Sequence, residues 1–184
     1  MRIADVRRIP LNALDVEMSI AEGEQALQVL LKFVSESAGK LEAHEAEMGI
    51  FKRLLPIGLA AMKLYFAQRG TGDLGAAVTR ADGMILPRET QLRGRDDVSL
   101  FGTFAVPRPC DCTPGEPGIF PLDAPVNLPE RCYSYFLQEW MTVFAVEHPF
   151  KESAGWFEPL FDLEVAESVL MEVAKEAPQD YEDF

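Results

Sequence analysis

The sequence predicts a mainly α-helical protein with a small β element, an α+β fold. Apolar residues recur every three or four positions in stretches around residues 19–39, 48–66 and 133–177, and this is the period of an amphipathic helix. Between residues 98 and 106 the period changes to two, as in a strand with one buried face. We therefore expect helices at both ends of the chain and short antiparallel strands between them.

Length and composition are those of an ordinary folded protein. The chain has 184 residues, of which 48% are hydrophobic and 26% charged, so it can bury a core as one domain or two small ones. No run approaches the ~18 apolar residues that span a bilayer, and residues 1–18 lack the apolar core of a signal peptide, so we expect a cytoplasmic protein without a membrane partner. Three cysteines, an odd and small number, suit a reducing compartment. We expect three segments: a helical N-terminal segment (1–82), a β-rich segment with a Pro-rich connector (83–126) and a helical C-terminal segment (127–184).

The net charge of −13 is concentrated in the second half of the chain. Residues 1–95 contain 13 Lys+Arg and 12 Asp+Glu, whereas residues 96–184 contain 4 and 18. An acidic half repels nucleic acid and fits a protein partner or simple solubility. Any DNA contact is therefore expected more readily from the first half.

The first predicted helix has a capping box formed by Ser19 and Glu22 and ends at Gly39. Its apolar stripe is expected to pack within the chain and consists of Leu27, Leu30, Leu31 and Val34. The alternative is that the N-terminal helices form a dimerising coiled coil. The sequence does not favour this, because it contains fewer than about three clean heptads.

The second helical tract runs from about Met48 to Phe66 and contains Pro56. An interior proline removes one hydrogen bond and clashes with the preceding turn, so we expect a kink or two helices rather than one rod. The Gly-rich run at 70–75 follows a helix and lacks the Lys-Ser/Thr ending of a phosphate-binding loop, so it is interpreted as a helix stop and linker.

The β-rich segment holds the most basic candidate surface. Residues 98–106 predict one strand. The arginines in or beside it are candidate DNA contacts, although a solvated strand face also explains them: Arg88, Arg93, Arg95 and Arg108.

Residues 107–129 contain 7 of the 13 prolines, which excludes helix and central strand and predicts an extended connector. Cys110 and Cys112 form a single C-x-C, and Cys132 and the two histidines lie elsewhere. Because structural zinc sites usually use paired C-x2-C spacings, the sequence predicts no metal ligand and no cofactor in this chain.

Three helices are expected in the C-terminal segment. Asn127 and Glu130 have capping-box spacing before the first, whose apolar face includes Tyr133 and Phe144. The second spans about 150–161 and the third about 166–177, and residues 162–165 have the length of a helix-turn-helix turn. The alternative is three packed helices without nucleic acid. Candidate DNA contacts on this unit are Lys151, Ser168 and Lys175.

The exposed face of the third predicted helix is poorly suited to phosphate contact, because it carries Glu167, Glu172 and Glu176. An interior proline, Pro159, also lies in the second of these helices, where it costs about 3 kcal/mol.

No nucleophile elbow, P-loop, Rossmann fingerprint or HExxH motif is present, so no residue is predicted to be catalytic.

Several segments together resemble the region that precedes the catalytic domain in ISKra-family insertion-sequence transposases. They are LPIGLAAMKLYFAQRGTGDLG from Leu54, SLFGTFAVPR from Ser99, GEPGIFPLDAPVNLPERCYSYFLQEW from Gly115, and PFKESAGWFEPLFDLEVAESVLMEVAKEA from Pro149. The resemblance implies a bacterial DNA transposase that recognises the ends of its element. Its Asp-Asp-Glu triad and two Mg²⁺ ions would belong to a later domain, absent from this chain, so the isolated chain is expected to be inactive. The run Cys110-Asp111-Cys112 and Pro159 depart from the family pattern.

Two functions follow as hypotheses. The first is a transposase fragment that recognises transposon ends and does not itself transpose. The second is an acidic helical protein-interaction module, which would bind a second copy or a full-length transposase.

Overall fold

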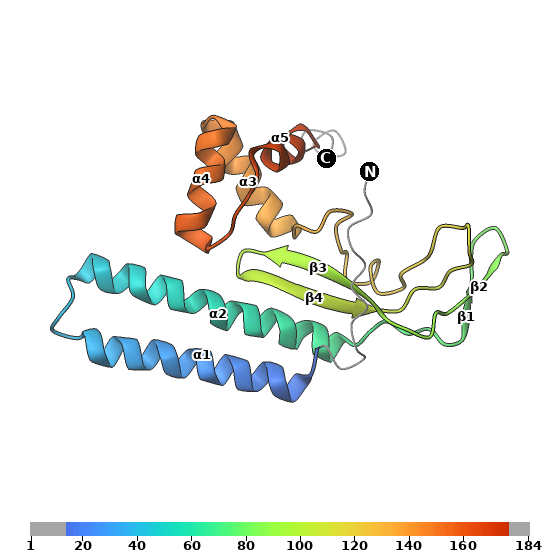
Figure 1. Cartoon of the computed structure of the whole chain (residues 1–184), viewed down its shortest axis with the longest axis horizontal. Coiled ribbons are helices and arrows are strands. Elements are labelled where there is room, and N and C mark those ends of the chain that lie inside the picture. Colours follow the sequence, from blue (N-terminus) through green and yellow to red (C-terminus); the bar gives the residue numbers. More distant parts are fainter. Residues whose placement is uncertain (1–13, 177–184) are drawn as a thin grey trace.

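The computed structural model describes residues 14–176 and confirms the mainly helical α+β fold. A long helical hairpin lies along one side, a bundle of three helices covers the β3–β4 hairpin, and a second small hairpin extends from the opposite end (Figure 1). In chain order these elements are α1 (Val16–Ser37), α2 (Ala43–Arg69), β1 (Ala77–Thr79), β2 (Ile85–Pro87), β3 (Arg93–Ser99), β4 (Gly102–Arg108), α3 (Tyr135–Glu147), α4 (Phe150–Phe161) and α5 (Glu167–Glu176). No helix within residues 14–176 is long and apolar enough to cross a membrane.

Helix α1 begins earlier than predicted. Its N-cap is Asp15, whose carboxylate accepts a hydrogen bond from the Met18 N–H at 2.8 Å, so the predicted cap at Ser19 is wrong. Ser19 is buried in the first turn and donates its hydroxyl to the Asp15 carbonyl at 2.7 Å. The predicted end is correct to within two residues: α1 ends at Ser37, and Gly39 has a φ of +78°.

The predicted packing of the apolar stripe on α1 is mostly wrong. Leu30 is buried, whereas Leu27, Leu31 and Val34 are exposed. Helix α2 covers the neighbouring face of α1, where small residues allow close approach: Gly23 lies against Ala60, and Phe33 lies over Gly49. The exposed residues Leu27, Leu31 and Val34 therefore lie beside the α1–α2 contact, on the outer face of the hairpin.

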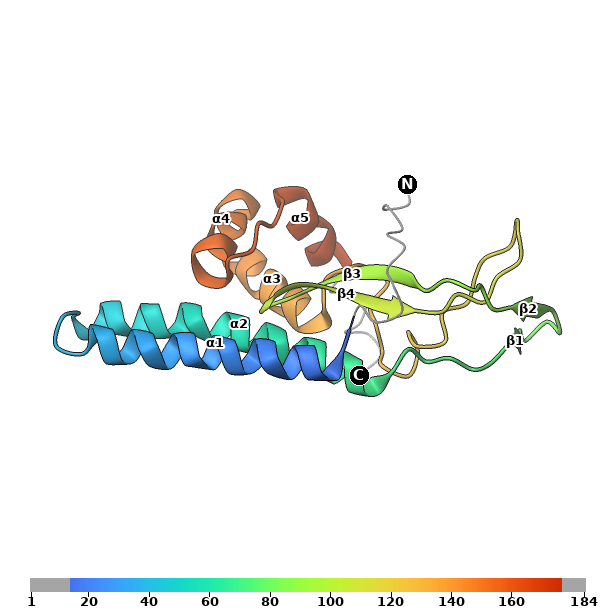
Figure 2. The same cartoon turned by 60° about the horizontal axis from the view of Figure 1, so that its bottom comes forward.

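Helix α2 runs through Pro56 as one continuous helix, so the predicted alternative of two helices is wrong (Figures 1 and 2). Pro56 is exposed, and the helix around it is held by packing against α1 and β4 along its length. One lost backbone hydrogen bond is offset by that packing. A capping box between Glu42 and Glu45 begins α2, and Gly70, with a φ of +77°, ends it as predicted.

The stretch predicted as one strand is an antiparallel hairpin. Strand β3 ends at Ser99 and β4 begins at Gly102, with Leu100 and Phe101 in the turn. The buried positions Asp97 and Ser99 of β3 are odd-numbered, whereas Phe104 and Val106 of β4 are even-numbered, because residues paired across the tight turn share a face. The apolar period of two in residues 98–106 does not reveal this reversal. Gly102 has a φ of +126°, which favours glycine at the turn.

Two further features differ from simple expectation. The β1–β2 hairpin pairs residues 77–79 with 85–87 and so bridges the segment boundary placed at residue 82. Strand β4 packs Phe104 and Val106 against Phe66 of α2 and Leu122 of the connector, which forms a second core.

The predicted cap at Asn127 is wrong, because α3 begins at Tyr135 with Ser134 as its N-cap. Residues 132–134 first pair with β3: the Val98 N–H donates to the Cys132 carbonyl at 2.7 Å, and the Ser134 N–H donates to the Val98 carbonyl at 2.9 Å. This pairing holds the chain extended until Ser134. Upstream, residues 109–134 contain no helix, in agreement with the predicted connector.

Helices α3, α4 and α5 enclose the main hydrophobic core. Its centre is formed by Leu137, Met141, Phe157 and Leu170, which are completely buried, and Leu100 from the β3–β4 turn joins it. The range of α4 agrees with the prediction, and α5 begins one residue late. The chain turns at Asp162, which adopts the left-handed conformation with a φ of 54°.

Candidate functional site

The four arginines predicted as a DNA surface are all paired with carboxylates. Arg93 contacts Glu89 at 2.5 Å and Arg95 contacts Asp97 at 3.1 Å, while the other two bind acids from distant segments. Those two pairs are Arg88 with Asp73 and Arg108 with Asp123.

Two of these arginines are mostly buried and make structural contacts within the fold. The side chains of Arg95 and Arg108 are 12% exposed. Arg95 also donates to the backbone carbonyls of Pro129 and Arg131, and Arg108 stacks on the Phe120 ring at 3.9 Å. These contacts tie the β3–β4 hairpin to the connector. They leave little unpaired positive charge for phosphates.

The candidate DNA contacts on the C-terminal helices, unlike Arg95 and Arg108, are exposed to solvent. Lys151, Ser168 and Lys175 are exposed on α4 and α5. Arg131, which the sequence reading did not single out, reaches α5 and contacts Glu172 at 2.8 Å and Glu176 at 2.5 Å. The hydrogen bond from Arg131 lowers the pKa of Glu176.

Arg131 therefore partly offsets the acidic charge of α5 near its C-terminal end. The only signal for it in the sequence is that it is one of four basic residues after position 95. Its partners lie 41 and 45 residues away along the chain, so no local pattern links them.

An open apolar cleft of about 660 Å³ lies where α2 meets the bundle. Lys52 of α2 crosses to α4 beside it: its Nζ contacts the Asp162 carboxylate at 2.5 Å and the Glu158 carbonyl at 3.3 Å. The cleft is lined by Phe51, Trp140, Phe144, Trp156, Pro159, Leu160 and Phe161. Such an aromatic cleft fits an apolar side chain of a partner and offers no group for acid–base chemistry.

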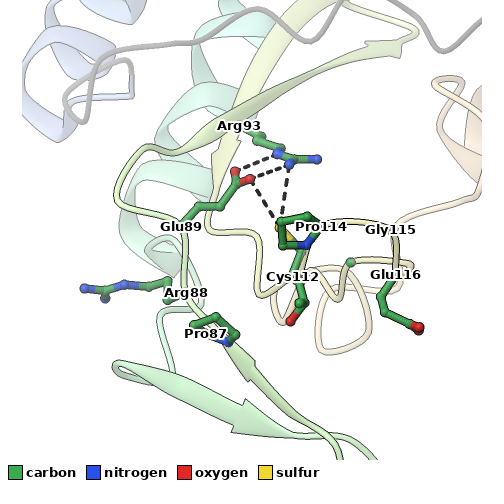
Figure 3. Close-up of a pocket in the computed structure, with 10 residues that line it drawn as sticks. Pro87, Arg88, Glu89, Arg93, Cys112, Pro114, Gly115 and Glu116 are labelled. Carbon is green, nitrogen blue, oxygen red and sulfur yellow. Dashed lines mark hydrogen bonds and ion pairs between the residues drawn. The ribbon is translucent and has the colours of Figure 1, made fainter.

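A second pocket, of about 450 Å³, lies between the segment after β2 and the connector. Figure 3 shows Glu89, Arg93 and Cys112 at this pocket, with their side chains turned toward one another. The Cys112 thiol donates to Glu89 Oε1 at 3.2 Å, and Arg93 Nη2 lies 3.7 Å from Cys112 Sγ. Cys110, which is fully buried, completes the cluster.

Backbone hydrogen bonds fix the position of both cysteines. The Glu89 N–H donates to the Cys110 carbonyl at 2.9 Å, and the Cys112 N–H donates to the Pro87 carbonyl at 3.1 Å. Gly118 lies so close that a Cβ there would be 2.7 Å from Cys110 Sγ. Burial, with Glu89 and Cys110 alongside, raises the pKa of the Cys112 thiol to about 12.

Comparison of this chain with protein-family models, curated proteins and solved structures finds no match.

Proposed function

We propose that this chain is the pre-catalytic region of an ISKra-family transposase and contributes to DNA transposition in the bacterial cytoplasm by recognising transposon ends. The resemblance of its segments to that family supplies the proposal. No residue of the chain takes a catalytic role in it, and Mg²⁺ belongs to the catalytic domain that the family carries elsewhere.

The observation that carries the proposal is the arrangement of α3, α4 and α5. Helices α4 and α5 are joined by a short turn that begins at the left-handed Asp162, and both pack on α3 around Phe157 and Leu170. A helix-turn-helix has the same order, in which the second helix of the pair enters the major groove. Helix α5 would be the reading helix.

The exposed residues of this unit define which contacts it makes. Ser168 lies in the first turn of α5, where a recognition helix contacts base edges, and Lys151 and Lys175 supply the positive charge. The pairing of Arg131 with Glu172 and Glu176 reduces repulsion of the phosphates. The paired arginines of the β region take a structural role in this proposal.

Fluorescence anisotropy with labelled DNA carrying the terminal repeats tests this function. Two lysine–phosphate contacts give a plot of log affinity against log salt with a slope of about −2. Lys151→Ala and Lys175→Ala should each weaken binding to all sequences and reduce the slope by about 1. Ser168→Ala should change preference between repeat and scrambled DNA while the slope stays the same.

Lys40→Ala is the matched control, because Lys40 is exposed in the loop between α1 and α2, far along the chain from α4 and α5. It should leave affinity and slope unchanged. Absence of binding at low salt, in a sample whose circular dichroism shows the native helices, would remove the DNA-recognition role.

The second candidate function is self-association, and one observation favours it. Ile20, Leu27, Leu31 and Val34 of α1, which we call the α1 stripe, are between 43% and 50% exposed. At 3.6 residues per turn they fall within an arc of roughly 60°. A second copy of the chain with the same stripe is the matching partner, since apolar rows on two helices bury each other.

Light scattering coupled to size exclusion measures this association. The wild-type chain is expected to form a dimer, and Leu27→Lys should give a monomer with unchanged helix content because Leu27 makes no core contact in the single chain. Gln25→Lys, an exposed position on the opposite side of α1, should remain dimeric. A wild-type monomer at all concentrations would exclude self-association through the α1 stripe.

A further inference from the structure

We propose that Glu89, Cys110 and Cys112 form a binding site for one zinc ion. Their ligand atoms, one carboxylate oxygen and two thiol sulfurs, all lie within 4.8 Å of one another. The proposal concerns metal binding and is independent of whether the chain binds DNA.

The three ligands come from two separate segments that the fold brings together. Glu89 follows β2, and the cysteines follow β4, with 20 residues between Glu89 and Cys110. Reciprocal backbone hydrogen bonds hold the segments side by side, from Glu89 to Cys110 and from Cys112 to Pro87. The ligand positions are therefore set by main-chain pairing, which reduces the entropy lost when a metal binds.

One of the three ligand spacings is close to that of a tetrahedral zinc site. With Zn–S near 2.3 Å and Zn–O near 2.1 Å, two tetrahedral ligands lie about 3.6 to 3.8 Å apart. The hydrogen bond between Cys112 Sγ and Glu89 Oε1 spans 3.2 Å, so these two atoms need to separate by only a few tenths of an ångström. The proton in that hydrogen bond lies between the two ligands, and a cation would take its place.

The charges balance with and without the metal. In the metal-free cluster the Cys112 thiol donates its proton to the Glu89 carboxylate, and Arg93 contacts the same carboxylate at 2.5 Å. Binding of Zn²⁺ releases the two thiol protons to solvent. The two positive charges of the ion replace those of the two protons, so the net charge of the cluster together with Arg93 stays zero. Arg93 keeps its partner in both states. Two thiolates with one carboxylate are a borderline-soft set, which suits zinc better than Mg²⁺ or Ca²⁺.

The pocket beside the cluster leaves room for a fourth ligand. Glu89 and Cys112 line the pocket of about 450 Å³ (Figure 3). Thr113 and Gly115 also line it. Among residues 14–176 no fourth Cys, His or carboxylate belongs to the cluster. A water molecule or a small anionic ligand would complete the tetrahedron, as in zinc sites that keep one exchangeable position.

Titration of the reduced, chelator-treated full chain with Zn²⁺, and separately with Co²⁺, tests the site. We expect one metal ion per chain, and for Co²⁺ the intense visible and near-ultraviolet absorption of tetrahedral cobalt thiolate. Loss of a supporting group around a metal costs 10- to 100-fold in affinity, so loss of a thiolate ligand in Cys112→Ser should cost at least about 100-fold. Glu89→Gln should cost at least about 10-fold and keep the cobalt–thiolate absorption, because both thiolates remain.

Cys132→Ser is the matched control, because Cys132 is an exposed free cysteine outside the cluster. It should bind zinc like the wild type. A second measurement requires no substitution: each Zn²⁺ ion bound should release about two protons, measured with a pH indicator in weak buffer. Zinc binding that survives Cys112→Ser, or a folded wild-type chain that neither binds Co²⁺ as a thiolate complex nor releases protons with Zn²⁺, would overturn the proposal.

Discussion

Asp97 of β3 is a buried carboxyl group whose ionisation opposes folding. It is 4% exposed, and burial raises its pKa to about 6, although the charges of Arg95 and Arg108 act in the opposite direction. Its Oδ2 atom has no hydrogen-bond partner. The folded pKa lies above the unfolded value of 3.8, so the folded chain keeps a proton that the unfolded chain releases. The stabilising contribution of Asp97 is therefore complete below pH 3.8 and is lost as the pH rises through about 6.

Asp97→Asn should remove this pH dependence. At about 1.4 kcal/mol per pKa unit, the wild type should lose up to about 3 kcal/mol of unfolding free energy between pH 4 and pH 7 relative to the variant. Denaturant unfolding at several pH values measures the difference. Asp96→Asn, at the exposed neighbouring position of the same strand, should keep the wild-type profile. Parallel profiles for wild type and Asp97→Asn would show that Asp97 is not the group responsible.

At the scale of one element, α4 contains a proline that does not interrupt it. Pro159 lies two residues before the end of the helix, at an exposed position, and deprives the Gly155 carbonyl of its helical donor. Pro159→Ala should restore that bond and raise the unfolding free energy by about 2 kcal/mol. This is the helix cost of proline, about 3 kcal/mol, less the ~1 kcal/mol by which proline restricts the unfolded chain.

Pro149→Ala serves as the comparison, measured by the same chemical denaturation. Pro149 is the N-cap of α4, where no helical N–H is missing, so its replacement should change stability by less than about 1 kcal/mol. If the two substitutions change the unfolding free energy equally, the interior position of Pro159 is not the reason for the stability that it costs.

At the scale of the whole molecule, the β3–β4 hairpin is seated on α2 through a glycine. A Cβ at Gly58 would lie 2.3 Å from the ring of Phe101, which is in the hairpin turn. Helix propensity alone would make alanine better than glycine by about 1 kcal/mol. The clash forces Phe101 away from α2, so Gly58→Ala should instead destabilise the chain by about 1 to 3 kcal/mol.

Gly155→Ala tests the same exchange without the clash. Gly155 is also inside a helix, but a Cβ there meets nothing within 4 Å, so alanine should stabilise the chain by up to about 1 kcal/mol. Thermal unfolding of both variants gives opposite shifts if packing between α2 and the hairpin decides the sign. Stabilisation by both substitutions would contradict that view.

Local sequence patterns predicted the boundaries of an element correctly where no distant segment affects them. The range of α4, the ends of α1 and α2 near Gly39 and Gly70, and the connector follow from helical period, glycine at helix ends and proline density. The connector begins after Arg108, two residues later than predicted, because β4 includes Pro107 and Arg108. The errors occurred where a distant segment intervened. Pairing of residues 132–134 with β3 delays α3 until Ser134, and packing on both sides carries α2 through Pro56.

The candidate sites were less predictable than the fold. The sequence located the basic residues but not their partners, because Asp73 and Asp123 lie 15 residues from the arginines they neutralise. Cys110 and Cys112 were visible as a pair, whereas Glu89 joins them only through pairing between two segments. Spacing rules for zinc ligands cannot detect such a ligand.

The sequence by itself determined which stretches are helical, extended or proline-rich and which half of the chain is acidic, since these properties depend on neighbouring residues and composition. Only the tertiary structure decided which apolar rows are covered, which arginines are already paired, and that Glu89 meets the two cysteines. The physical reason is that ion pairs, metal clusters and helix packing depend on distances between segments remote in the chain. Those distances are fixed only when the core formed by α3, α4, α5 and the hairpin turn is in place.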